Sequence, residues 1–245
     1  MSELSRSRRL ALRFFVGLCA CLAFPLLLIL QLPPVPAVGV AWDLANMLGY
    51  VALACFALLF VYVGRPRAFP PFSGRFFANL HRDLGYIALL LVTAHVGILL
   101  VAEPLLLEHL KPAAPLYMLA GLVAALLLLV LVVSSTPHWR RRIWPDYRRF
   151  RFLHAWLAVA CLVLGCWHIV GSQFYLNSNV KLAAGCLVAA LVFGFYIRGR
   201  YRSRVSTQRH SRLRDGNIYA HRVVYGSALL LLLAAAAIAV LRALA

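Results

Sequence analysis

The amino-acid sequence predicts an all-α integral membrane protein, and three observations support this fold class. Of its 245 residues, 63% are hydrophobic and only 13% are charged, whereas soluble domains are about half apolar and about one quarter charged. The apolar residues gather in runs long enough to cross a hydrocarbon core about 30 Å thick, which takes roughly 20 helical residues. The basic residues are concentrated in short segments between these runs.

Seven apolar runs are expected to form transmembrane helices. They cover residues 11–32, 43–63, 79–101, 115–134, 152–171, 180–197 and 221–243. The first run follows a basic N-terminus, as in a secretory signal peptide. It is long for such a signal, and six further runs follow it, so we expect a retained signal anchor.

The basic residues predict the orientation of these helices. They cluster in the N-terminal stretch and in the connections 64–78, 135–151 and 198–220. The alternate connections hold few charges, namely Asp43, Glu103, Glu108, Lys111 and Lys181. By the positive-inside rule, all four basic segments lie on the cytoplasmic side of a membrane, which we expect to be a bacterial inner membrane, with the N-terminus inside. The net charge of +18 therefore reflects topology, and we expect no nucleic-acid partner.

The cysteines are expected to be small hydrophobic side chains without a disulfide or metal role. All six lie inside apolar runs: Cys19, Cys21, Cys55, Cys161, Cys166 and Cys186.

Nucleotide-binding motifs are missing, since neither a G-x-G-x-x-G pattern nor a P-loop occurs. The 198–220 connection is too short for a flavin- or nicotinamide-binding domain.

Four of the eight histidines form two pairs with identical spacing. His81 and His95 lie in the third apolar run and His154 and His168 in the fifth, with fourteen positions between the members of each pair. Fourteen helical residues return to within about 40° of the starting direction and rise about 21 Å. Each pair therefore shares a helix face, and its members lie near opposite edges of the hydrocarbon core. Because both helices run outward, His81 and His154 share the inner level, and His95 and His168 the outer level.

Two facing imidazoles at each of two depths predict two haem groups. Haem iron held by two imidazoles has no open position and favours electron transfer over substrate chemistry. The second ring nitrogen of each ligand should donate to a backbone carbonyl or a polar side chain. The anionic propionates need cations at the membrane edge, and four arginines lie at the inner level: Arg82, Arg148, Arg149 and Arg151.

A proton relay or metal transport remains compatible with histidines inside a membrane. Either would bring carboxylates into the spans, and the nearby acids, Asp43 and Asp83, are expected at span edges. The remaining histidines flank the spans and receive no ligand role: His109, His138, His210 and His221.

The histidine-bearing segments resemble a known family. The stretch SSTPHWRRRIWPDYRRFRFLHAWLAVACLVLGCWH (134–168) joins an Arg-rich inner connection to an aromatic residue and two histidines at opposite ends of one helix. HRDLGYIALLLVTAH (81–95) forms the companion span. Together they resemble the ferric reductase-like transmembrane domain superfamily, which includes ferric reductases, NADPH oxidases and the haem-binding membrane subunit of the methionine sulfoxide reductase system.

This resemblance implies a six-helix di-haem cytochrome b bundle plus one additional C-terminal transmembrane helix. Its haem ligands would be His81, His154, His95 and His168. The implied division is an N-terminal anchor helix and outer loop (1–42), the ferric reductase-like core (43–197), and a basic loop with the extra helix (198–245). Ferric reductases and NADPH oxidases usually continue into FAD- and NADPH-binding domains, where this chain has a further apolar run. The methionine sulfoxide reductase subunits lack such domains.

We therefore expect the electron-transfer subunit of an oxidoreductase, without its own NAD(P)H or FAD domain. Its two haem b groups would carry electrons from a cytoplasmic flavoprotein reductase to an acceptor at the outer face, with a flavin supplied by the partner or bound at the Arg-rich inner face. Ferric iron, quinone, oxygen or a periplasmic reductase, such as a methionine sulfoxide reductase, all fit as acceptor. A membrane transporter or assembly factor without enzymatic function is the alternative class.

Overall fold

The fold is known from a computed structural model, which describes residues 3–32, 39–63, 72–175 and 216–244 together with residues 178, 179, 183 and 194. Within these ranges the chain is helical and contains no β-strand. The elements are α1 (Glu3–Leu30), α2 (Val40–Val61), α3 (Gly74–Ala102), the 3₁₀ helix η1 (Pro104–Leu110), α4 (Leu116–Ser135), α5 (Pro137–Ile143), α6 (Tyr147–Ser172) and α8 (Gly216–Leu244). The predicted all-α fold class is confirmed.

Six of the described helices are long and apolar enough to cross a membrane. Their apolar parts are Leu12–Leu30, Val40–Val61, Gly74–Ala102, Leu116–Ser135, Tyr147–Ser172 and Val224–Leu244. They correspond to six of the seven predicted spans. The remaining prediction, 180–197, falls outside the described residues except for positions 183 and 194.

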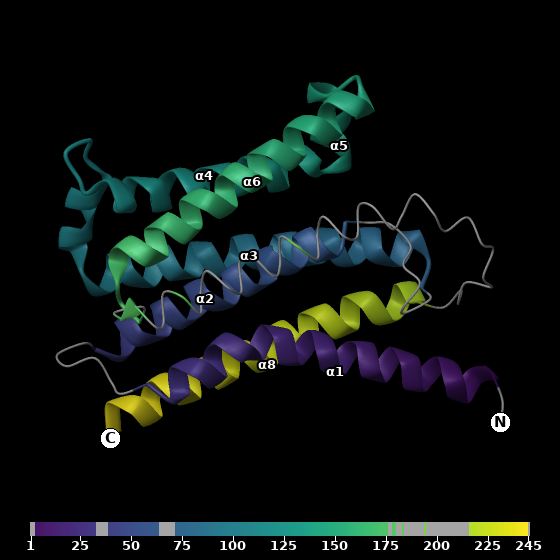
Figure 1. The fold of residues 1–245 in the computed structure, drawn as a ribbon, viewed down its shortest axis with the longest axis horizontal. Helices are drawn as coiled ribbons and strands as arrows, with labels where there is room; N and C mark the ends of the chain where they lie inside the picture. Colours follow the sequence, from purple (N-terminus) through teal and green to yellow (C-terminus); the bar gives the residue numbers. More distant parts are fainter. Residues whose placement is uncertain are drawn as a thin grey trace.

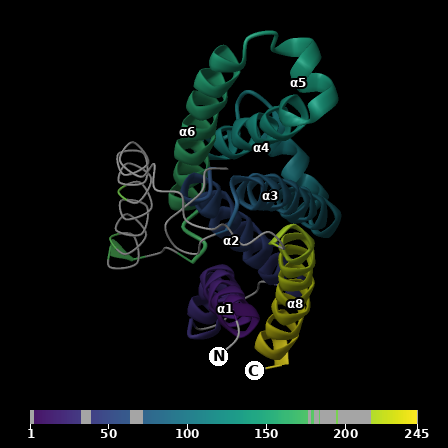
Figure 2. The same cartoon turned by 90° about the vertical axis from the view of Figure 1, so that its right-hand side faces the viewer.

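The long helices form three layers, each of two helices (Figure 1). The pair α4 and α6 forms one outer layer, α2 and α3 form the middle layer, and α1 and α8 form the other outer layer, as the turned view also shows (Figure 2). The N-terminus and α5 lie at one end of the bundle, and the C-terminus lies at the opposite end. We call the end that carries α5 the inner end, following the predicted orientation.

Polar caps extend two of the helices beyond the predicted apolar runs. α3 begins at Gly74 because the Ser73 side chain accepts a hydrogen bond from the backbone N–H of Phe76 at 3.2 Å. α6 begins at Tyr147 because the carboxylate of Asp146 accepts from the N–H of Arg148 at 2.8 Å. Such caps satisfy backbone donors that the first helical turn leaves unpaired. Hydropathy alone does not detect them, so both helices start five residues earlier than expected.

Two connections that we read as loops contain short helices. η1 follows α3, α5 follows α4, and each begins with a proline in its first turn. Proline is favoured there because its missing N–H would have no partner and its φ is already helical. His109 lies in η1 and His138 in α5.

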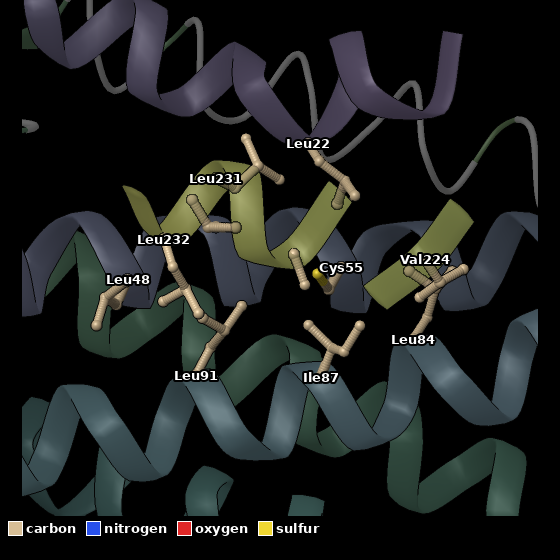
Figure 3. A pocket seen from close by; sticks show the side chains of 11 residues that line it. Leu22, Leu48, Cys55, Leu84, Ile87, Leu91, Val224, Leu231 and Leu232 are labelled. Carbon is tan, nitrogen blue, oxygen red and sulfur yellow. The ribbon is translucent and has the colours of Figure 1, made fainter. Parts of the chain in front are cut away.

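The helix α8 packs against α1, α2 and α3 with one face. Side chains of α8 meet those of α1, α2 and α3 around a small apolar pocket, lined by Leu22, Leu48, Val51, Cys55, Leu84, Ile87, Leu91, Val224, Ala228, Leu231 and Leu232 (Figure 3). Val224, Ala235 and Ala239 of α8 are at most 1% exposed. None of the four paired histidines lines this pocket, so it belongs to the packing of the bundle and not to the candidate site.

Candidate site of two histidine pairs

The structure brings the four paired histidines together at two levels. His81 and His95 lie on α3, and His154 and His168 lie on α6. At the inner level, the ring centroids of His81 and His154 are 6.2 Å apart with 55° between the ring planes. At the outer level, those of His95 and His168 are 6.5 Å apart with planes at 74°. Each ring on α3 therefore meets the ring of α6 at the same depth.

On α3, both rings are held by backbone carbonyls of the neighbouring helix or its end. The Nδ1 of His81 lies 2.8 Å from the carbonyl oxygen of Tyr62, at the end of α2. The Nδ1 of His95 lies 2.7 Å from the carbonyl oxygen of Ala45, near the start of α2. A carbonyl can only accept, so Nδ1 carries the proton in both rings. The lone pair of each ring then resides on Nε2.

On α6, both rings are held by residues of α4 in the same way. The Nδ1 of His168 lies 3.1 Å from the carbonyl oxygen of Tyr117. The Nδ1 of His154 lies 3.3 Å from the hydroxyl of Ser135, and this hydroxyl donates its own proton to the carbonyl of Leu131 at 2.6 Å. The Ser135 oxygen is therefore an acceptor for His154. With Nδ1 protonated, each neutral ring has an unprotonated Nε2, which is the form in which imidazole binds metals.

Glycines make room for the two outer rings. A Cβ added to Gly121 of α4 would lie 2.6 Å from Nδ1 of His168, and one added to Gly49 of α2 would lie 3.2 Å from Nδ1 of His95. A third glycine brings α6 close to α4, since a Cβ on Gly171 would lie 2.3 Å from Cβ of Tyr117. No sequence pattern distinguishes these glycines, because only the facing helix shows which of them meets a ring.

Aromatic rings connect the inner pair to the inner end of the bundle. The ring of Phe150 lies 5.3 Å from that of His154, and Tyr147 and Trp144 lie 6.1 Å and 6.2 Å from Phe150. Tyr147 is 59% exposed, and the guanidinium carbons of Arg140 and Arg151 each lie 5.9 Å from its ring centroid. The basic connection between α4 and α6 thus lies next to the inner histidines.

The two acids expected at span edges are buried in the structure. Asp43, on the first turn of α2, is 7% exposed and accepts a hydrogen bond from Nε of Arg242 at 2.6 Å. Tyr175 donates its hydroxyl to the same carboxylate. Burial, followed by this hydrogen bond, raises the pKa of the Tyr175 phenol.

Asp83 is even less accessible, at 1% exposed. Its Oδ2 lies 2.5 Å from Nδ1 of His221, and its Oδ1 lies 3.3 Å from Nε of Arg82. Partners on α8 compensate the burial of both acids, which would otherwise be costly in an apolar bundle. Both carboxylates lie in contact with these partners.

The remaining predicted residues are distributed as follows. The ring of His138 packs against Trp139 at 5.6 Å on α5, and His109 lies in η1, while His210 is outside the described ranges. Arg82 is paired with Asp83, and Arg149 lies 3.8 Å from Asp146. The described cysteines, Cys19, Cys21, Cys55, Cys161 and Cys166, are free thiols, and Cys186 is not described. Within the described ranges no three His, Cys, Asp or Glu side chains gather as a metal cluster.

These features define a helical membrane protein with two depth-matched histidine pairs in its bundle. A family model described as ferric reductase like transmembrane component matches residues 48–179, which include all four paired histidines. The chain belongs to this family, which indicates a membrane electron-transfer component. Searches of curated proteins and of solved structures returned no match.

Proposed function

We propose that this chain is a b-type cytochrome that moves electrons across the bilayer through two haems. His81 and His154 would hold the inner haem, and His95 and His168 the outer haem. The observation that carries the proposal is the pairing of four rings whose Nδ1 atoms all have acceptors. Such acceptors fix the ring orientation and make Nε2 a better ligand.

The distance between the rings fits a metal bound by both. Protein metals bind histidine nitrogen at about 2.0–2.1 Å, and the nitrogen lies about 1 Å from its ring centre, so two imidazoles on one metal have centroids about 6 Å apart. The observed separations are 6.2 Å and 6.5 Å. Two imidazoles without further protein ligands suit an iron whose other four positions are occupied by a porphyrin.

A buried donor near the inner pair also fits an anionic, planar cofactor. The indole nitrogen of Trp144 is buried and has no hydrogen-bond partner among the described residues. Trp144 packs on Phe150, which contacts the inner histidine His154. Buried donors normally have acceptors, and a haem propionate is an acceptor of the required charge.

In this function the iron, when bound, supplies a one-electron change without making or breaking bonds to substrate. The protein's own residues do the rest. The histidine rings fix two redox centres at two depths, and the Nδ1 acceptors hold each ring in one orientation. The apolar side chains of the bundle exclude water around them.

The donor that fits this arrangement is a cytoplasmic flavoprotein reductase. Arg141, Arg142 and Arg148 are exposed at the inner end, and exposed cations steer and hold acidic protein surfaces or flavin phosphates. Electrons would leave from the outer pair to an acceptor at the outer face. Ferric iron is the acceptor that the family suggests, and a periplasmic reductase such as a methionine sulfoxide reductase is the alternative.

Absorption spectroscopy of the purified protein tests the proposal. We expect a Soret band and reducible α and β bands equivalent to two haems per chain. H154A and H168A should each lose one haem, whereas H138A, a histidine of α5 outside both pairs, should keep two. A colourless wild-type protein, or one whose haem survives both substitutions, would refute the function and leave a transporter or assembly factor as the better reading.

A further inference from the structure

The helix α8 carries a polar residue near each end that binds a buried carboxylate of the core. His221 lies near its inner end and contacts Asp83 of α3, and Arg242 lies near its outer end and contacts Asp43 of α2. The two residues are 21 positions apart, about 31 Å along the helix, which matches the thickness of the hydrocarbon core. The family match ends at residue 179, so α8 lies outside the segment shared with the family.

The outer contact joins four parts of the chain. Besides Asp43, the Arg242 guanidinium donates to the carbonyl of Ile29 at 2.8 Å and to that of Leu32 at 2.5 Å, at the end of α1. Asp43 also accepts from Tyr175, which follows α6. Arg242 is 7% exposed. One buried guanidinium thus ties together the outer ends of α1, α2, α6 and α8.

This outer network lies directly beside the groups that hold the outer histidines. Asp43 is two residues before Ala45, whose carbonyl accepts from His95. Tyr175 is seven residues after His168, just beyond the end of α6 at Ser172. Displacement of the first turn of α2 would move the acceptor of His95, and displacement of the segment after α6 would move the helix that carries His168.

The contact between His221 and Asp83 likewise lies beside the inner histidine pair. Asp83 is two residues after His81 on α3, and its carboxylate is almost inaccessible to solvent. His221 of α8 and the neighbouring Arg82 both approach this carboxylate. A buried carboxylate is disfavoured when it loses a polar partner. Loss of His221 leaves Asp83 with the partly exposed Arg82 beside it, and we expect this turn of α3 to shift.

We propose that α8 is a positioning helix for the two haem sites, with Arg242 setting the outer site and His221 setting the inner site. This inference rests on the proposed function, since it assigns each residue to one of the two haems. The two residues act through Asp43 and Asp83 and contact neither pair of ligands themselves. The same helix therefore adjusts two redox centres independently, one at each membrane edge.

Two substitutions in the full-length protein test this assignment. We expect R242Q to bind the outer haem roughly tenfold more weakly, and H221Q to bind the inner haem roughly tenfold more weakly. A tenfold loss of affinity is usual when a group that supports a metal ligand is removed. Redox titration and low-temperature EPR of each variant report the two haems separately. H168A and H154A identify which signal belongs to the outer and which to the inner haem.

Matched variants distinguish a folding defect from a specific effect on haem positioning. R9Q removes an exposed arginine of α1 and should leave both haem signals unchanged. R242K keeps the charge and should restore part of the outer signal even if R242Q does not yield a monodisperse protein.

The proposal is overturned if R242Q and H221Q leave both haem signals as in the wild type. It is equally overturned if either substitution alters the two haems to the same extent, or if R242K and R242Q behave alike. A wild-type protein without haem would instead refute the proposed function, so the two failures are distinguishable.

Discussion

At the scale of single residues, the candidate site depends on acceptors for the histidine Nδ1 atoms. Three are backbone carbonyls, which the helices supply whatever their sequence, and one is the hydroxyl of Ser135. The last is the only one of these acceptors that a side-chain substitution removes directly. The four rings are therefore unequal in how sensitive they are to mutation.

S135A should weaken the inner haem selectively. The substitution leaves the Nδ1 proton of His154 without its acceptor, and loss of such a supporting group typically lowers metal affinity by roughly tenfold or more. Haem content and the redox titration of the inner centre measure this effect. S172A is the matched control, because the Ser172 hydroxyl donates to the carbonyl of Ile169 in an exposed position. Equal inner-haem content in S135A and S172A would contradict the expectation.

G121A should disturb the outer pair. The new Cβ would lie 2.6 Å from Nδ1 of His168, and forcing extra volume into a packed site typically costs about 1–3 kcal/mol. We expect a lower thermal midpoint and loss of the outer haem signal.

G97A provides the comparison for G121A within another helix. Nothing lies within 4 Å of a Cβ added to Gly97, and replacing a helical glycine by alanine stabilises by roughly 0.5–1 kcal/mol. The midpoint of thermal unfolding should therefore fall in G121A and rise in G97A. A shift in the same direction would show that the close approach of Gly121 to His168 is not a constraint.

At the scale of elements, the helix caps decide where α3 and α6 begin. Each begins about two turns before its first histidine, and the added residues bring Phe76, Phe77 and Phe150 into the helices. Phe76 and Phe77 are buried, and Phe77 stacks on Tyr62, whose carbonyl holds His81. Phe150 packs on His154. The caps therefore help to place the aromatic residues around the inner pair.

D146A should fray the first turn of α6. Loss of an N-cap acceptor costs about 1 kcal/mol, which corresponds to roughly fivefold faster hydrogen exchange of the Arg148 amide when exchange follows local opening. Hydrogen exchange followed by mass spectrometry on the 146–152 segment measures this rate. D146N should exchange like the wild type, because asparagine caps as well as aspartate. Fast exchange in D146N would indicate that charge, and not the cap, holds this turn.

At the scale of the whole molecule, the described basic segments occur at the same end of the bundle. α5, with Arg140, Arg141 and Arg142, lies at the end that holds the N-terminus (Figure 1). η1 and its connection to α4 lie at the other end, where Glu108 and Lys111 pair with each other. The alternation of charge along the sequence thus becomes a difference between the two ends of the bundle.

Cysteine labelling from outside intact cells tests which end faces out. K111C should react with a membrane-impermeant maleimide, and R142C should react only after permeabilisation, because the positive-inside rule places the arginine-rich end in the cytoplasm. Both positions are exposed. The unsubstituted chain corrects for its own free cysteines. Labelling of R142C in intact cells would reverse the orientation and the proposed direction of electron flow.

Much of the fold and of the candidate site follows from local patterns. Hydropathy finds the apolar runs, because the bilayer demands about 20 apolar residues for each helical span. The spacing of fourteen between His81 and His95, and between His154 and His168, fixes a shared helix face and two depths. The structure places these rings together in the pairs that the depth argument gives. Haem ligation by these rings stays a prediction.

Contacts between distant segments were beyond the reach of such patterns. Asp43 and Arg242 are 199 positions apart, and Asp83 meets His221 only because α8 packs against α3. The carbonyl acceptors of the histidines and the glycines that admit the rings also depend on which helix lies opposite. The periodicity of one helix does not show which other helix packs against it.

Hydropathy and helical pitch act within each segment, so they predict a helical membrane protein with histidines at two depths without knowledge of its packing. The burial of Asp43 and Asp83, and their contacts with α8, depend on packing between segments. A carboxylate enters an apolar bundle only with a partner, and here a distant part of the chain supplies that partner.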